Sequence, residues 1–294
     1  MDPASLIAAA LSLAAAYSLV ALGFVLVLSM TGAVNFAQGD LVVAGGFMAV
    51  AVLAIIPDGP WMMPLVVLPL TLLVMAVGGV AFGALAYLPL ARRSAPTIFL
   101  ASIAVAMMIQ NGLLGLFGPA PRSTPPLLSG GPVDLPGFSL DRQTLAVLVV
   151  AGGLLLAAGL ILTRTRFGLR LRAVAEDSDM AAAMGVPVAV VRLATFALAA
   201  ALAGAAGLML AHQFFLTPAD GAGFMLKAYI AATLGGWGRL SGAIMGACVI
   251  ALLETAGAAL LGFVAAEALL YGLVIVLLVV RPGGLLGEKS GERP

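Results

Sequence analysis

Apolar residues run along the chain in long continuous stretches that short polar segments separate. A hydrocarbon core about 30 Å thick takes roughly 20 apolar helical residues to cross. Strands of an outer-membrane barrel would instead alternate apolar with polar residues over about ten positions, and these stretches do not alternate. The pattern predicts membrane-spanning helices at 6–30, 41–56, 61–90, 98–117, 145–162, 193–211, 240–261 and 265–280, with a short ninth apolar segment at 224–234.

The third stretch, 61–90, is longer than one crossing requires and contains Pro64 and Pro69, which predicts a tilted or kinked helix. Small residues inside several stretches would let helices approach one another closely. The clearest of these are Gly78, Gly79, Gly83, Gly152, Gly153, Gly204 and Gly207.

Composition agrees with this membrane assignment. The 294 residues are 63% apolar and 9% charged, with a mean hydropathy of +1.17. Soluble domains carry about 25% charged residues, so a soluble enzyme, a disordered chain and a nucleic-acid binder are all excluded. One Cys and one His cannot form a disulfide framework or a Cys/His metal site. We expect an all-α polytopic membrane protein of about 8–9 transmembrane helices, forming a single domain over 1–294.

Basic residues predict how the helices are oriented, because Lys and Arg gather in cytoplasmic loops. Arg92 follows the third stretch, five Arg residues lie within 163–192, and more basic residues end the chain. The segment 119–143 is rich in Pro and Gly and has balanced charges. We therefore expect a periplasmic loop at 119–143, a cytoplasmic loop at 163–192 and a cytoplasmic C-terminus. The N-terminus lies outside if 224–234 counts as a crossing.

Two polar, glycine-rich breaks interrupt the apolar pattern, one in each half of the chain. The first contains Asn35, Gln38, Gly39 and Asp40, and the second covers 235–242. Interrupted hydrophobic segments at matching places in two halves of a transporter point to the substrate path. Asn, Gly, Gln and Asp also form ordinary surface turns. Both interpretations stay open for both breaks.

The loop 163–192 is the longest charged segment. After a basic first half, Glu176 and Asp177 precede a short Ala-rich run that contains Ala181, Ala182 and Met184. Acidic residues favour a helix N-terminus, and Gly185 followed by Pro187 is a stop signal. We expect a helix of about two turns, which either inserts into a partner protein or simply connects two spans.

Isolated polar residues in the apolar stretches are candidates for function, because intramembrane charge is costly. Glu254 lies in mid-stretch, and it either faces a substrate path or pairs with a buried neighbour. Lys227 and Glu267 lie near segment ends, where we expect them to reach the membrane interface. Gln110 and Asn111 could line a path, but interhelical hydrogen bonds are commoner for such amides and are the favoured expectation.

Several of these motifs together resemble one family. The residues at 35–40, Asn-Phe-Ala-Gln-Gly-Asp, are similar to a stretch of the LivH-type branched-chain amino acid permeases of ATP-binding cassette (ABC) importers. The segments 172–177, 227–238 and 281–287 and the run from Glu176 to Gly185 are similar to that family as well. Gln38 stands where the family often has His, and Asp40 where it often has Glu, which leaves the identity of the solute open.

The resemblance implies an ABC importer permease fold and a chain that is not itself an ATPase. It also implies two ATP-binding subunits that hold ATP and Mg²⁺, a second LivM-like permease subunit and a periplasmic amino-acid-binding protein. The chain has no Gly-x-x-x-x-Gly-Lys-Ser/Thr phosphate loop, and we expect no cofactor on it. The alternatives are a permease for urea, an amide or a sugar, and a self-sufficient channel or secondary transporter.

Overall fold

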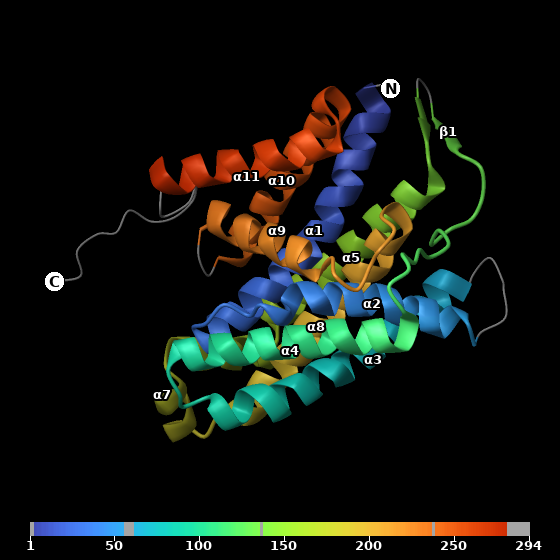
Figure 1. Ribbon diagram of the computed structural model, residues 1–294. Helices are drawn as coiled ribbons and strands as arrows, with labels where there is room; N and C mark the ends of the chain where they lie inside the picture. Colours follow the sequence, from blue (N-terminus) through green and yellow to red (C-terminus); the bar gives the residue numbers. More distant parts are fainter. Residues whose placement is uncertain (1–2, 56–61, 136–137, 237–238, 281–294) are drawn as a thin grey trace.

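The computed structural model describes residues 3–55, 62–135, 138–236 and 239–280. These residues form a bundle of helices, with one small hairpin of two three-residue strands (Figure 1). The helices are α1 (Pro3–Thr31), α2 (Ala37–Leu53), α3 (Leu68–Phe82), α4 (Ala95–Phe117), α5 (Arg142–Arg164), α6 (Arg166–Glu176), α7 (Ser178–Ala183), α8 (Val188–Gln213), α9 (Gly221–Leu234), α10 (Leu240–Leu261) and α11 (Phe263–Val280). The hairpin pairs β1 (Val133–Leu135) with antiparallel β2 (Phe138–Leu140).

The predicted apolar stretches are confirmed as helices. Within the described ranges, six are long and apolar enough to cross a membrane, and α2, α9 and α11 are shorter apolar helices. This agrees with the expected 8–9 helices, some of them short or broken. Since a residue of α-helix rises 1.5 Å, the 14 residues of α9 span only about 21 Å, less than the hydrocarbon core. The hairpin inside 119–143 is an addition to the all-α prediction.

The long third segment is irregular at both ends, as its length and prolines predict. It opens with a π-helical turn, Met63–Val67, that contains Pro64, and Pro69 lies in the first turn of α3. A second π-helical turn, Gly83–Tyr87, follows α3. A widened turn is a common place for a helix to deviate from straightness.

Helices α1 and α8 lie at the centre of the bundle. Of the most apolar 18-residue window of each, 89% is buried in α1 and 72% in α8, against 6% in α4. Glycine permits the closest approaches. A Cβ at Gly207 of α8 would overlap the carbonyl oxygen of Val42 in α2, and a Cβ at Gly79 would overlap that of Phe196. Gly78, Gly152 and Gly153 have no neighbour within 4 Å of such a Cβ, so the prediction that they pack helices together is wrong within the described chain.

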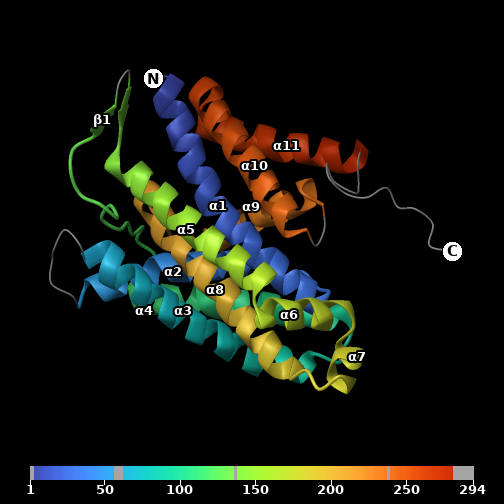
Figure 2. The ribbon, with the colours of Figure 1, turned by 180° about the vertical axis from the view of Figure 1, so that it is seen from behind.

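The two loops expected on opposite sides of the membrane lie at opposite ends of the bundle. The beginning of α1 lies beside the β1–β2 hairpin, and both are far from α7 (Figures 1 and 2). The start of α1 and the segment 119–143 therefore share one side. The basic C-terminal residues from Arg281 onward, and Trp237 in the second break, lie outside the described residues.

Candidate functional site

The first polar break is a buried connection between α1 and α2. Gly32, with φ of +64°, ends α1 in a left-handed conformation that a residue without Cβ adopts easily. Asn35 then accepts a hydrogen bond at Oδ1 from the backbone N–H of Ala37, 3.2 Å away, where α2 begins. Gln38, Gly39 and Asp40 belong to the first turn of α2, and all three are buried.

Buried side-chain amide atoms of Gln38 and Asn35 lack hydrogen-bond partners among the described residues. Gln38 is fully buried between α1 and α8, where a Cβ added to Gly23 would lie 2.7 Å from its Nε2. Both polar atoms of the Gln38 amide, and Nδ2 of Asn35, have no hydrogen-bond partner among the described residues. Each is an unsatisfied group that a change of conformation or a bound ligand would relieve.

Gly39 brings α2 against the start of α9. A Cβ at Gly39 would overlap the carbonyl oxygen of Gly221, and a Cβ at Gly221 would overlap the carboxylate of Asp40. The polar first turn of α2 is thus held against the polar entry to α9 by two glycines. Gly221 was not among the residues that the sequence singled out.

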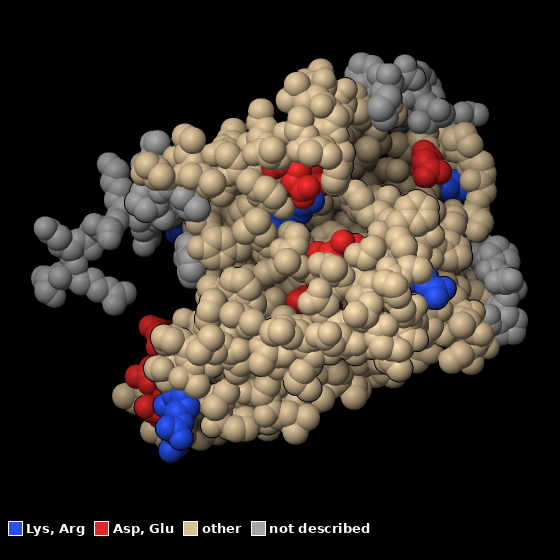
Figure 3. Space-filling model, viewed as in Figure 1, with Lys and Arg blue, Asp and Glu red and all other residues tan. Residues whose placement is uncertain are grey.

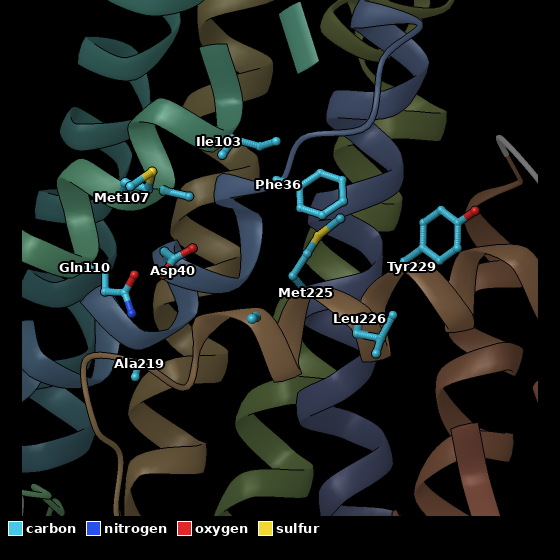
Figure 4. Close-up of a pocket in the computed structure, with 11 residues that line it drawn as sticks. Phe36, Asp40, Ile103, Met107, Gln110, Ala219, Met225, Leu226 and Tyr229 are labelled. Atoms are coloured by element: carbon cyan, nitrogen blue, oxygen red, sulfur yellow. The ribbon is translucent and has the colours of Figure 1, made fainter. Parts of the chain in front are cut away.

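Asp40 lines a cavity of about 390 Å³ between α2, α4 and α9. Figure 4 shows Gln110 and Met107 of α4 on one side of the cavity and Tyr229 of α9 on the other. Small-molecule sites are typically apolar cavities of this size with a few polar groups that fix orientation. The other lining residues are Phe36, Ile103, Ala106, Ala219, Ala222, Met225 and Leu226, so the walls are apolar around one carboxylate and one amide.

A buried ionic network lies on another part of α9. Lys227 Nζ is 2.7 Å from Glu254 Oε1 of α10, and Tyr17 of α1 donates to Glu254 Oε2 over 3.0 Å. Glu267 Oε1 of α11 is 3.9 Å from the same ammonium group, and it accepts a hydrogen bond from Tyr271. The network therefore ties α9 to three helices.

These positions correct the prediction for Lys227 and show which neighbour Glu254 has. Lys227 was expected to reach the membrane interface, but its side chain is only 9% exposed because Glu254 compensates its charge. Glu254 is the buried partner of a basic neighbour, and it does not line the cavity at Asp40. The sequence could not pair them, because 27 residues separate Lys227 from Glu254 and 210 separate it from Tyr17.

A second cavity, of about 510 Å³, lies beside this network. Asp220, Lys227 and Glu267 contribute its charged groups, and Ala219 lines both this cavity and the one at Asp40. Figure 3 shows that the face in view is almost entirely uncharged and that acidic side chains are visible in the hollow across its middle. The few charges of this region are thus gathered around the start of α9.

The charged loop forms two short helices at the other end of the bundle. Asp177 caps α7, because its Oδ1 accepts hydrogen bonds of 2.9 Å from the backbone N–H groups of Asp179 and Met180. Glu176 is the last residue of α6, Asp177 is the N-cap and α7 begins at Ser178, two residues after Glu176. The six residues of α7 form about two turns, as expected.

Gly185 terminates α7 as the pattern predicts. Its φ is +81°, and the N–H groups of Gly185 and Val186 donate to the carbonyl oxygens of Ala182 and Ala181 over 2.9 and 3.0 Å. This pair of bonds is a Schellman motif. Ala181 is buried against the bundle, whereas Ala182 and the large side chains of Met180 and Met184 are exposed, at 62% and 79% for the two methionines.

The amides of α4 differ from expectation. Asn111 donates from Nδ2 to the carbonyl oxygen of Met107 in its own helix, over 2.7 Å, and its side chain is exposed. Gln110 lines the cavity at Asp40. Neither makes an interhelical hydrogen bond among the described residues, so that prediction is wrong for this part of the chain.

Comparison with known proteins agrees with this architecture. A family model described as the branched-chain amino acid transport system / permease component matches residues 6–279. The chain belongs to this permease family. No solved structure matches it.

The chain has similar relatives along nearly its whole length. It is 29% identical to the high-affinity branched-chain amino acid transport system permease protein BraD of Pseudomonas aeruginosa, over 96% of this chain and 95% of BraD. It is 27% identical to the corresponding permease protein LivH of Escherichia coli, over 96% of this chain and 94% of LivH. It is also 34% identical to the autoinducer 2 import system permease protein LsrC of Klebsiella pneumoniae, over 51% of this chain and 47% of LsrC.

Proposed function

We propose that the chain is the permease subunit of an ATP-driven importer and carries branched-chain or related amino acids across the bacterial inner membrane. Family membership supports the transport role. The observation that carries the assignment of a path is the buried polar turn at the start of α2, with Asp40 opening into an apolar cavity. Irregular polar backbone and charge at membrane depth are costly and are tolerated where protein groups pair with them or where they line a cavity, so a polar turn beside a cavity favours a path.

The cavity at Asp40 has the chemistry that a branched-chain amino acid requires. Met107, Met225 and the surrounding aliphatic residues offer an apolar surface for the side chain of the solute. The Asp40 carboxylate is a counter-ion for an ammonium group, and the Gln110 amide can donate to a carboxylate. Asn35, Gln38 and Gly39 support this turn, whereas Glu254 holds the helix that forms the opposite wall.

In this account, α6 and α7 receive motion from two ATP-binding subunits, which hold the ATP and Mg²⁺. The exposed Met180, Ala182 and Met184 form the contact surface, and the caps at Asp177 and Gly185 keep the short helix rigid. A second LivM-like permease and a periplasmic amino-acid-binding protein complete the importer. The 163–192 loop and the C-terminus then face the cytoplasm, and 119–143 faces the periplasm.

Two experiments test this proposal. The tagged chain, purified from its native membrane in mild detergent, should bring two ATP-binding subunits and a second permease with it, as identified by mass spectrometry. Recovery of the chain alone, under conditions that preserve a known importer, would contradict the proposal and favour a self-sufficient channel or secondary transporter.

The second experiment tests the path. Ala106→Leu adds bulk inside the cavity, and Ala104→Leu adds the same bulk on the exposed face of α4 as a matched control. Leucine uptake should fall with the first variant and persist with the second. Equal uptake by both variants would place the path elsewhere. Competition of leucine uptake by urea, amides or sugars decides between amino acids and the alternative solutes.

A further inference from the structure

The largest of the cavities described, about 670 Å³, shares no lining residue with the cavity at Asp40. It is a groove between α1, α5, α6 and the start of α10. Its walls are apolar and come mainly from Leu22, Leu26, Leu155, Leu162, Leu171, Leu240 and Ile244. On α1 the lining runs from Ser29 back to Leu22, a distance of about 10 Å along the helix.

The groove has a charged rim at one end. Arg172 and Glu176 of α6 and Arg239 before α10 line this rim, together with the hydroxyl groups of Ser29 and Thr163. Helix α6 follows a membrane-spanning helix after a single residue, so the rim lies where the apolar interior meets the charged loop. The groove thus has an apolar interior and a polar mouth at the membrane boundary.

Arg172 is positioned at this mouth. Its Nη1 donates to the carbonyl oxygen of Leu162, near the end of α5, over 2.5 Å. No ion pair joins Arg172 to Glu176 among the described residues. A guanidinium has five N–H donors, so most of those of Arg172 remain for another acceptor, and a phosphate diester is the acceptor that a membrane supplies there.

The surrounding charge favours an anion. From the end of α5 to the end of α6 the chain carries four Arg, at 164, 166, 170 and 172, and one Glu, at 176, a net charge of +3. Basic pockets between membrane helices on the cytoplasmic side bind acidic lipid headgroups. Docked membrane helices instead meet through small residues and shared polar groups. The leucine-rich walls of this groove, with Gly159 as the small residue of α5, suit an acyl chain better.

We propose that this groove binds one anionic phospholipid, with its phosphate on Arg172 and an acyl chain along α1 and α5. The bound lipid fills the space between these helices and the amphipathic α6, whose inner face is formed by Gly168, Leu171 and Val174. This proposal is independent of which solute the protein carries.

Native mass spectrometry of the detergent-solubilised protein, together with any subunits that co-purify, tests the proposal. The protein is titrated with dioleoyl phosphatidylglycerol and, separately, with dioleoyl phosphatidylcholine. We expect one phosphatidylglycerol to be retained in preference to phosphatidylcholine. Arg172→Gln should weaken this binding about tenfold. Arg170→Gln removes the same charge from a position on α6 that does not line the groove, and it should have little effect.

A second pair of variants tests the groove independently of charge. Gly159→Leu fills open space in the groove, because no atom of the described residues lies within 4 Å of the added Cβ. Gly153→Leu, on the same helix and equally unhindered but outside the groove, is its control. Retention of phosphatidylglycerol by Gly159→Leu, or equal binding of the two lipids, would overturn the proposal. A photo-crosslinker at position 159 that reacts with protein instead of lipid would also overturn it and would identify a subunit interface.

Discussion

Replacement of Lys227 by Met gives the sharpest test of the ionic network. In the wild type, Lys227 Nζ lies 2.7 Å from Glu254 Oε1, and both side chains are buried. The variant leaves the Glu254 carboxylate in an apolar interior, with Tyr17, 3.0 Å away, as its remaining hydrogen-bond partner among the described residues. No second basic side chain lies within ion-pair distance of Glu254 among the described residues.

The expected magnitude follows from this isolation. Loss of one partner of a buried ion pair costs about 3–5 kcal/mol, because the other charge stays buried and uncompensated. Glu254→Gln should cost less, about 1–2 kcal/mol, because the Gln oxygen can still accept from Lys227, and Glu267, 3.9 Å away, still compensates the ammonium charge. In the double variant Lys227→Met/Glu254→Gln the two losses should not add, and the loss should be smaller than that of Lys227→Met alone.

The wild type, the two single variants and the double variant form a double-mutant cycle. The free energy of unfolding of each is measured by denaturant titration in the same detergent. Equal losses for the two single variants that sum in the double variant would refute the reasoning, because the two groups would then be independent. Leucine uptake by the double variant tests the role of the Lys227–Glu254 pair. A folded and active double variant identifies the pair as structural, and a folded but inactive one shows that transport requires the pair.

Three further changes have defined outcomes. Gly207→Ala should lower the free energy of unfolding by about 1–3 kcal/mol, because its Cβ would overlap the carbonyl oxygen of Val42. Gly78→Ala places its Cβ within 4 Å of no described neighbour and should be neutral or slightly stabilising. Equal effects of the two variants in denaturant titration would contradict the packing argument. Gln38→Met removes two unsatisfied amide atoms, so it should raise the melting temperature while it slows leucine uptake. A lower melting temperature would show that the Gln38 amide already has a hydrogen-bond partner. Gly185→Ala places a residue with a Cβ at φ +81°, at a cost of about 1–2 kcal/mol. It should weaken the stimulation of ATPase activity by solute more than Gly185→Asn does, because Asn tolerates that conformation. Equal stimulation in both variants would show that the end of α7 does not affect coupling to the ATPase.

The sequence predicts the helices well because the bilayer imposes a simple rule of length and apolarity. It also predicts the end of α7, because Gly185 acts through local backbone geometry that neighbouring residues determine. The start of α7, at Ser178, lies two residues after Glu176, because Glu176 and Asp177 are both acidic and only the cap geometry distinguishes them.

The candidate site is less predictable because long-range contacts create it. The polar turn at 35–40 is visible in the sequence, but its proximity to Gly221 is not. Lys227 looks like an interfacial residue until its partners on α1 and α10 are known. Glycines present the same difficulty, since Gly79 packs tightly whereas Gly78 beside it has no close neighbour in the described part of the chain.

Leucine uptake by proteoliposomes that contain this chain tests the central claim most directly. The chain is reconstituted with its co-purifying subunits and binding protein, and uptake is measured with and without ATP. The account predicts uptake that requires ATP, the partner subunits and this chain together, and that falls when Ala106→Leu narrows the cavity at Asp40. Leucine flux through the chain alone, in the absence of ATP, would contradict it.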